Sequence, residues 1–144
     1  MIITNEFIWR IDHYAYHLTN IEAMRYICSE GLKPICGERS KSVNDDIKGI
    51  FFFENLYMIN DWIDALYKNK NIYELELLRF NLKNRKWLMR NIDEYYLTNK
   101  VQPNKIEYLR LCDKEQNIYL PLDTDKEAVI EWNKLSNYKS LKKV

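Results

Sequence analysis

Cysteine, proline and glycine are scarce in this chain, with three of each among its 144 residues. The cysteines are odd in number and widely spaced, so neither a disulfide framework nor a zinc site is indicated, and no metal is expected. The prolines and glycines stand singly and form no linker, and no repeat is present. We therefore expect a single domain over residues 1–144, with a frayed lysine-rich tail from about residue 137.

An excess of charge of one sign is also missing, because 22 basic residues face 21 acidic ones. Nucleic-acid binding therefore cannot be argued from the net charge of +1. No apolar run is long enough to span a membrane, and the first residues show no signal-peptide pattern, so we expect no membrane association and a cytoplasmic location. One local basic cluster fits either a nucleic-acid backbone contact or a solvated hairpin: Lys83, Arg85, Lys86 and Arg90.

Apolar residues, in contrast, make up 47% of the chain, which is typical of a globular protein. The segment "YAYHLT" at 14–19 has the aromatic content of a short strand. Thr19 and Glu22 have capping-box spacing, so a helix is expected to begin there and to end before Gly31. The inward face of this helix consists of Ile21, Met24, Ile27 and Cys28.

The rest of the chain contains more strands than helices. A polar loop at 33–48 leads to a short buried strand at 49–53, and Asn55 caps a second helix with Leu56, Ile59, Ile63 and Leu66 inward. Strands are expected at 72–82, 86–89 and 117–122, and as a pair around Pro103 within 93–111. A final amphipathic helix is expected at 125–135, with Ala128, Val129, Trp132 and Leu135 inward. This order predicts an α+β fold with mixed or antiparallel sheets.

Three segments have the residue types that carry chemistry. They are "YHLT", with His17 at a strand end; "GIFFFENLYMINDW", an aromatic strand that runs into a helix; and "DEYYLTNKVQPNKI", in which Glu94 begins a late strand. Each alone has an ordinary structural explanation, namely a packed histidine, an aromatic core and a solvated acidic pair. Their order and their flanking residues favour a common role.

In this order the segments resemble the ADP-ribosyltransferase superfamily, in its histidine–aromatic–glutamate branch. "YHLT" is similar to the first-strand motif, "GIFFFEN" to the second motif, and "DEYYLTNKVQPNKIEYL" to the third, where the catalytic glutamate opens a strand. "YHLTNIEAMRYICSEGLKP" is also similar to the opening of DNA-ADP-ribosylating toxins of the DarT type. The resemblance covers roughly residues 14–111 and implies an ADP-ribosyltransferase-like split β-sandwich with short flanking helices.

The resemblance implies that NAD is a substrate, cleaved between nicotinamide and ribose through an oxocarbenium-like transition state. Glu94 and His17 are the implied catalytic residues: the carboxylate stabilises positive charge on the ribose, and the imidazole holds a ribose hydroxyl. The backbone of Leu18 would hold the nicotinamide amide. Arg39 fits a pyrophosphate contact and an ordinary exposed loop position equally well. The full set of implied NAD-binding residues is His17, Leu18, Thr19, Arg39, Phe51 and Trp62.

Two departures from the family pattern bear on the reaction. Phe51 stands where tyrosine is usual, which keeps ring stacking and removes a hydroxyl. Ile92 stands where arginine-modifying members carry a glutamate or glutamine, so transfer to protein arginine is disfavoured. A nucleobase, a nucleic acid or another small nucleophile is then the expected acceptor.

Other activities stay open beside this one. The RNA 2′-phosphotransferases of the same fold use several histidines, and the presence of only His13 and His17 counts against them. A degenerate fold that binds a nucleotide or a protein without turnover is favoured by Phe51. Toxin, phage counter-defence and regulatory roles all fit a small transferase.

Overall fold

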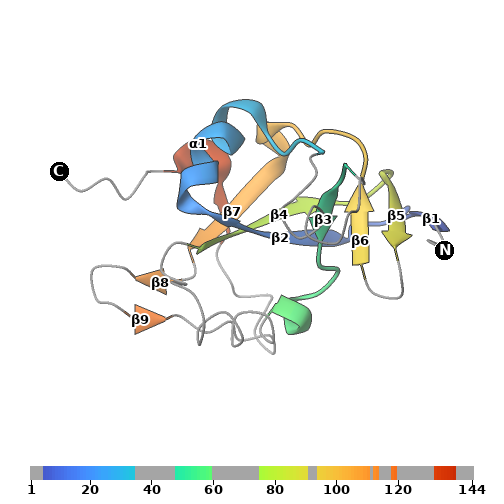
Figure 1. Cartoon of the computed structure of the whole chain (residues 1–144), viewed down its shortest axis with the longest axis horizontal. Coiled ribbons are helices and arrows are strands. Elements are labelled where there is room, and N and C mark those ends of the chain that lie inside the picture. The colour runs from blue at the N-terminus through green and yellow to red at the C-terminus, as the bar shows by residue number, and fades with distance from the viewer. Residues whose placement is uncertain are drawn as a thin grey trace.

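The computed structural model describes residues 5–34, 48–59, 75–90, 94–110, 112–113, 118–119 and 132–138, which form two antiparallel sheets and a small ribbon (Figure 1). The first sheet has the order β1 (Asn5–Ile8), β5 (Lys86–Arg90), β6 (Glu94–Leu97) and β3 (Ile50–Phe52). The second has the order β10 (Asn133–Lys134), β7 (Ile106–Arg110), β4 (Leu75–Asn81) and β2 (Tyr14–Asn20). The ribbon pairs β8 (Cys112–Asp113) with β9 (Ile118–Tyr119).

The helix α1 (Ile21–Glu30) follows β2 directly. Its cap is Asn20, whose Oδ1 accepts a hydrogen bond from the Ala23 N–H at 2.8 Å. The capping-box prediction of Thr19 is therefore wrong by one residue, because β2 extends through Asn20. Met24 and Ile27 are buried, as the helical spacing predicts.

Glycine ends α1 in a conformation that other residues rarely adopt. Gly31 has a φ of 76°, and its N–H donates to the Ile27 carbonyl at 2.8 Å. The next residue, Leu32, exchanges two backbone hydrogen bonds of 2.9 Å with Val101, which precedes the 3₁₀ turn η2 (Pro103–Lys105). This pairing fastens the end of the helix to the segment between β6 and β7.

A second helical turn at 56–59 follows β3. Asn55 caps it as predicted, with its Oδ1 accepting from the Met58 N–H at 3.1 Å. Leu56 and Ile59 are fully buried, whereas the predicted continuation through Ile63 and Leu66 lies outside the described residues.

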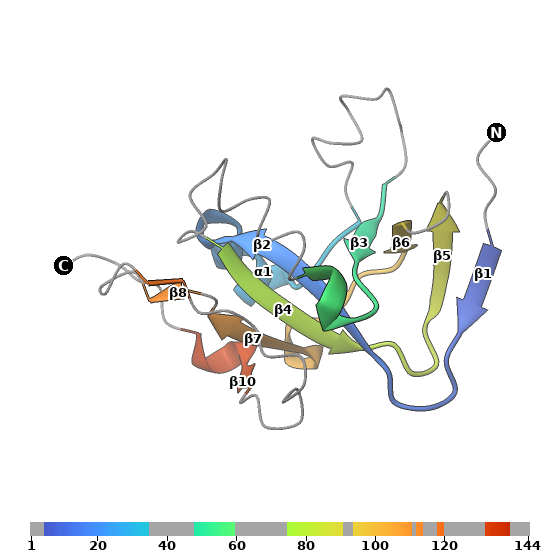
Figure 2. The same cartoon turned by 90° about the horizontal axis from the view of Figure 1, so that it is seen from below.

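In the part of the chain that the structure describes, one pair of residues joins the two sheets by backbone hydrogen bonds. Tyr16 in β2 and Phe53, just after β3, exchange backbone hydrogen bonds of 2.9 and 2.7 Å. Figure 2 shows β2 and β4 running obliquely to β3, β6 and β5, so the sheets diverge from this junction.

Large apolar side chains fill the space between the sheets. The Phe52 ring in the first sheet packs edge-on against Phe80 in the second, at 6.2 Å between centroids. Phe52 also contacts Trp87 and Tyr95 within its own sheet, at 5.7 and 6.0 Å. Burying each such side chain contributes about 1.5–3 kcal/mol. Phe52 is therefore a main link between the two layers.

The end of the chain differs from the prediction. The helix expected at 125–135 is wrong over its described part, because Asn133–Lys134 pairs with β7 as β10 and Leu135–Asn137 forms the 3₁₀ turn η4. The guanidinium of Arg79 in β4 lies over the Trp132 ring, 4.6 Å from the ring centroid, so Trp132 contacts the second sheet. Leu135 is buried, as expected, and residues 125–131 lie outside the described part.

Residues 137–138, at the start of the expected tail, pack against the second sheet. The Tyr108 hydroxyl donates to the Asn137 carbonyl at 3.3 Å, and the Tyr138 hydroxyl donates to Glu76 Oε1 at 3.3 Å. Residues 139–144 lie outside the described part. The fold is α+β, and within the described ranges no helix is long and apolar enough to cross a membrane.

Candidate functional site

The backbone groups of β2 point alternately to its two edges. On the β4 side, the His13 carbonyl accepts from the Leu82 N–H at 2.7 Å, whereas Tyr16 bonds to Phe53 on the β3 side. Residues two apart in a strand point their N–H and C=O to the same edge. Leu18 therefore directs both of its backbone groups toward the side where the sheets separate.

The side chain of His17 interrupts the pairing of β2 with β3. Since Tyr16 lies opposite Phe53, a continued antiparallel ladder would place Leu18 opposite Phe51. Instead, the Phe51 carbonyl accepts a hydrogen bond from Nδ1 of His17 at 2.6 Å. Within the described residues, no backbone hydrogen bond from Leu18 crosses this edge. Among the described residues, the N–H and C=O of Leu18 thus have no backbone partner on this edge.

The bond to Phe51 also decides the protonation of the His17 ring. A carbonyl oxygen only accepts hydrogen bonds, so Nδ1 must carry a proton. Burial lowers the pKa of His17, and the hydrogen bond to the Phe51 carbonyl opposes this effect only in part. At neutral pH the ring is uncharged, and Nε2 is a hydrogen-bond acceptor.

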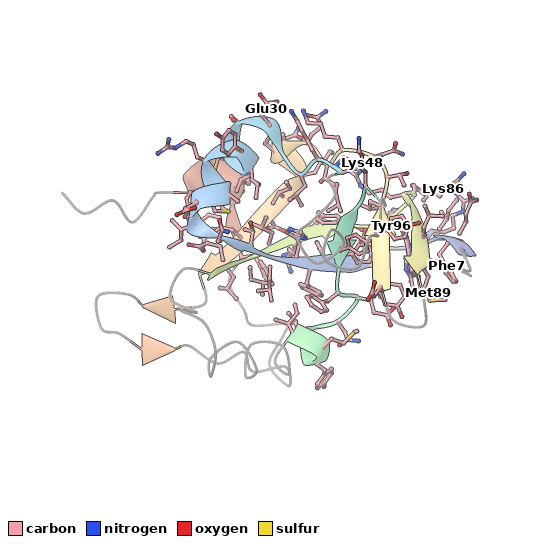
Figure 3. All side chains as sticks on the ribbon, viewed as in Figure 1. Phe7, Glu30, Lys48, Lys86, Met89 and Tyr96 are labelled. Carbon is pink, nitrogen blue, oxygen red and sulfur yellow. The ribbon has the colours of Figure 1, made fainter. Side chains whose placement is uncertain are left out.

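An aromatic pair lies beside this junction. Phe51 is opposite Tyr96 in the β3–β6 register, and the two ring centroids are 5.3 Å apart (Tyr96 is labelled in Figure 3). The Tyr96 side chain packs over the backbone of Gly49, where an added Cβ would lie 2.7 Å from Tyr96 Cδ2. The glycine of the "GIFFF" segment is thus needed for the position of the Tyr96 ring.

Glu94 begins β6 and is half-buried. It precedes Tyr96 by two residues, so its side chain lies on the face of the first sheet that carries Tyr96 and Phe51. The opposite face carries Phe52 and Tyr95. The strand order places β3 between β6 and the junction with β2, which separates the β2 and β6 backbones by roughly 10 Å.

The structure thus brings the three predicted motifs to three neighbouring strands. His17 contacts Phe51 directly, whereas Glu94 is related to them through the pairing of β3 with β6. Thr19 is half-buried and lies opposite Glu76 of β4, on the face of β2 that carries His17. Arg39 and Trp62 lie outside the described residues. No group of metal-binding side chains occurs in the described ranges.

The sequence alone does not single out Tyr96 or its contact with Gly49. The available signal is the alternation in "EYYL", which puts Glu94 and Tyr96 on one face. That signal does not reveal Phe51 and Gly49 as the neighbours, because the register between β3 and β6 joins residues more than 40 positions apart.

Comparisons with protein-family models, with curated proteins and with solved structures give no match to this chain.

Proposed function

We propose that this protein is an NAD-dependent ADP-ribosyltransferase, with the split β-sandwich of that superfamily and a non-arginine acceptor. The observation that carries the proposal is the junction of β2 and β3, where the His17 ring replaces the Leu18 amide at the Phe51 carbonyl. This replacement gives one short segment a free backbone donor, a free backbone acceptor and an imidazole acceptor, with an aromatic ring next to them.

These groups match the chemistry of nicotinamide riboside. A carboxamide has one acceptor and two donors, so it can pair with the N–H and C=O of Leu18 as an added strand would. The Phe51 ring supplies an apolar face for the flat pyridine ring. Nε2 of His17, as an acceptor, suits a ribose hydroxyl.

Glu94 would act on the reacting bond. When the bond between nicotinamide nitrogen and ribose C1′ breaks, its electron pair leaves with nicotinamide and positive charge develops on the ribose. A carboxylate stabilises this charge more strongly in the transition state than in the ground state. The acceptor nucleophile then forms the new bond to C1′ and loses its proton.

The substitution Glu94→Gln tests this assignment. The amide keeps the size and one acceptor, so NAD affinity should persist, whereas nicotinamide release should fall about 10²–10³-fold, or roughly 3–4 kcal/mol. Single-turnover assays with labelled NAD measure the rate, and calorimetry measures the affinity. Glu30→Gln, at the exposed end of α1, is the matched control and should leave both unchanged.

Binding without turnover is the competing function, and Phe51 in place of tyrosine favours it. A wild-type protein that binds NAD but releases no nicotinamide, with or without oligonucleotides as acceptors, would support a nucleotide-binding module. Equal nicotinamide release by wild-type and Glu94→Gln proteins would remove Glu94 from catalysis. The absence of NAD binding at millimolar concentration would count against both functions.

The acceptor is proposed from the position of Ile92, which lacks the carboxylate or amide of arginine-modifying enzymes. We expect label from NAD to appear on nucleic acid or on a small nucleophile. Incubation with single-stranded DNA, RNA and an arginine-rich protein in parallel would separate these acceptors, and label on the protein alone would contradict the proposal.

A further inference from the structure

A pocket lies on the face of the first sheet opposite Phe51, Tyr96 and Glu94. It has a volume of about 380 Å³, within the range of small-molecule sites. Phe7 pairs with Trp87 in the β1–β5 register, and Met89 pairs with Tyr95 in the β5–β6 register, so these side chains share one face. Figure 3 labels Phe7 and Met89 near β1 and β5. The lining consists of Phe7, Ile8, Trp9, Glu54, Trp87, Met89 and Tyr95.

One acidic group stands in this apolar lining. Glu54 is half-buried, and Glu54 and Tyr95 carry the only side-chain oxygens among the lining residues. The Tyr95 hydroxyl donates to Glu54 Oε1 at 3.5 Å, which is a long hydrogen bond. Within the described ranges, no lysine, arginine or histidine forms an ion pair with Glu54. The pocket therefore has a carboxylate among aromatic rings and no cationic side chain among its described lining residues.

The arrangement of the rings favours a compact cation over a flat ligand. Trp87 and Tyr95 meet at 85° with centroids 5.2 Å apart, which makes a corner. Phe7 is stacked on Trp87 at 4.5 Å, and Trp9 is stacked on His13 at 4.2 Å, so one face of each of these rings is already covered. A flat ring needs a parallel slot, whereas a cation binds to ring faces set at angles to one another.

The position of the acceptors distinguishes between kinds of cation. A primary ammonium has three N–H donors and is strongly hydrated. The three side-chain oxygens of the lining lie together on Glu54 and Tyr95, whose hydroxyl donates to Glu54, so the hydration lost on the other sides of the ammonium would not be replaced. A quaternary ammonium has no donor, and its methyl groups suit Trp87, Met89 and Ile8. We propose that this pocket binds a quaternary ammonium group, with Glu54 as its counter-ion. The proposal is independent of the proposed function.

The test compares choline with its neutral isostere, 3,3-dimethylbutan-1-ol, in titrations of the full chain. Tryptophan fluorescence reports binding, because Trp9 and Trp87 line the pocket. Choline should bind at millimolar concentration, and the isostere about tenfold more weakly, since it lacks the cation–π and carboxylate attraction. No choline binding, or equal binding of the two probes, would overturn the proposal.

Glu54→Gln isolates the carboxylate. This variant should reduce choline affinity about tenfold and leave the isostere unaffected. The control Glu6→Gln makes the same change on β1, at an exposed side chain paired with Lys86, and should bind choline like the wild type. Unchanged choline affinity in Glu54→Gln would overturn the role of Glu54, and the wild-type probe comparison stands even if that variant fails to fold.

A quaternary ammonium group occurs in small metabolites and in trimethylated lysine. A peptide with trimethyl-lysine, titrated beside choline and the unmodified peptide, separates these sources. If the modified peptide binds more tightly than choline, the ligand is trimethyl-lysine in a protein. If the two bind equally, the ligand is a small quaternary ammonium cation. Equal binding of the modified and unmodified peptides would contradict selection for a quaternary group.

Discussion

The contact between Gly49 and Tyr96 gives a prediction that tests both the packing and the candidate site. In Gly49→Ala, the new Cβ would lie 2.7 Å from Tyr96 Cδ2 and 3.1 Å from Tyr96 Cβ and Cγ. These atoms cannot move freely, because Tyr96 is 5% exposed and its strand pairs on both sides. Overpacking of this kind typically costs about 1–3 kcal/mol, so the free energy of unfolding should fall by that amount.

A double-mutant cycle with Tyr96→Ala measures this contact by chemical denaturation. Without the Tyr96 ring, the added methyl group meets fewer atoms, so Gly49→Ala should cost at least about 1 kcal/mol less than in the wild-type background. Nicotinamide release should also fall in Gly49→Ala, since the displaced ring is next to Phe51. Lys48→Ala, at an exposed neighbouring residue labelled in Figure 3, is the control and should change stability by less than about 0.5 kcal/mol.

Two results would refute this reasoning. Unchanged stability in Gly49→Ala would mean that Tyr96 does not pack over Gly49. An equal loss with and without the Tyr96 ring would mean that the cost comes from the backbone of residue 49 and not from the ring.

Three further predictions concern single residues. Gly31→Ala should destabilise the protein more than Gly49→Ala in denaturation, because its Cβ would lie 2.0 Å from the Val101 carbonyl and its φ is 76°. The lowered pKa of His17 means that the unfolded chain binds its proton first, so stability and NAD affinity should be full above about pH 6.5 and fall as the pH drops through the lower folded pKa. In His17→Asn this pH dependence of stability should disappear, and its persistence would point to another group. Burial and the charge of Glu76 raise the pKa of the Cys28 thiol, so peptide mapping at pH 8 should show slower alkylation of Cys28 in the folded protein than in the unfolded chain.

The strands with regular alternation could be predicted from the sequence. β2, β3, β4, β5, β6 and β7 lie within the expected segments or overlap them, because each contains aromatic or β-branched residues and ends near a polar or proline-containing turn. The first helix was predictable for a similar reason, since Met24 and Ile27 recur at helical spacing and Gly31 ends the run.

The elements that the sequence does not reveal depend on distant partners. β1 has four residues, and its pairing of Phe7 with Trp87 joins positions 80 residues apart. β10 lies within a segment of helical periodicity. The contact of Trp132 with Arg79, which is itself bonded to Glu107 at 2.9 Å, overrides that local preference. In both cases the deciding interaction comes from the tertiary structure.

The order of the three motifs, through the family resemblance, predicts that His17, Phe51 and Glu94 lie near one another. Their strands are neighbours in the structure, because β2 is bridged to the end of β3 and β3 pairs with β6. The choice of Nδ1 as the donor to Phe51 cannot be read from the sequence, because it depends on the relative position of two strands from separate sheets.

The position of His17 at the junction of the sheets links the fold to the candidate chemistry. If the antiparallel ladder continued past Tyr16, Leu18 and Phe51 would exchange backbone hydrogen bonds. Neither backbone group of Leu18 would then be free on this edge. The imidazole of His17 forms a hydrogen bond with the Phe51 carbonyl and with no backbone group of Leu18. Among the described residues, the Leu18 N–H and C=O therefore have no backbone partner where the sheets diverge. A side chain without a hydrogen-bond donor at residue 17 would leave the Phe51 carbonyl without this bond, and closing of the ladder would be its simplest replacement. The structural explanation of His17 and the proposed functional one are therefore not alternatives: the bond that ends the pairing of β2 with β3 also leaves exposed to this edge the groups that we propose bind NAD.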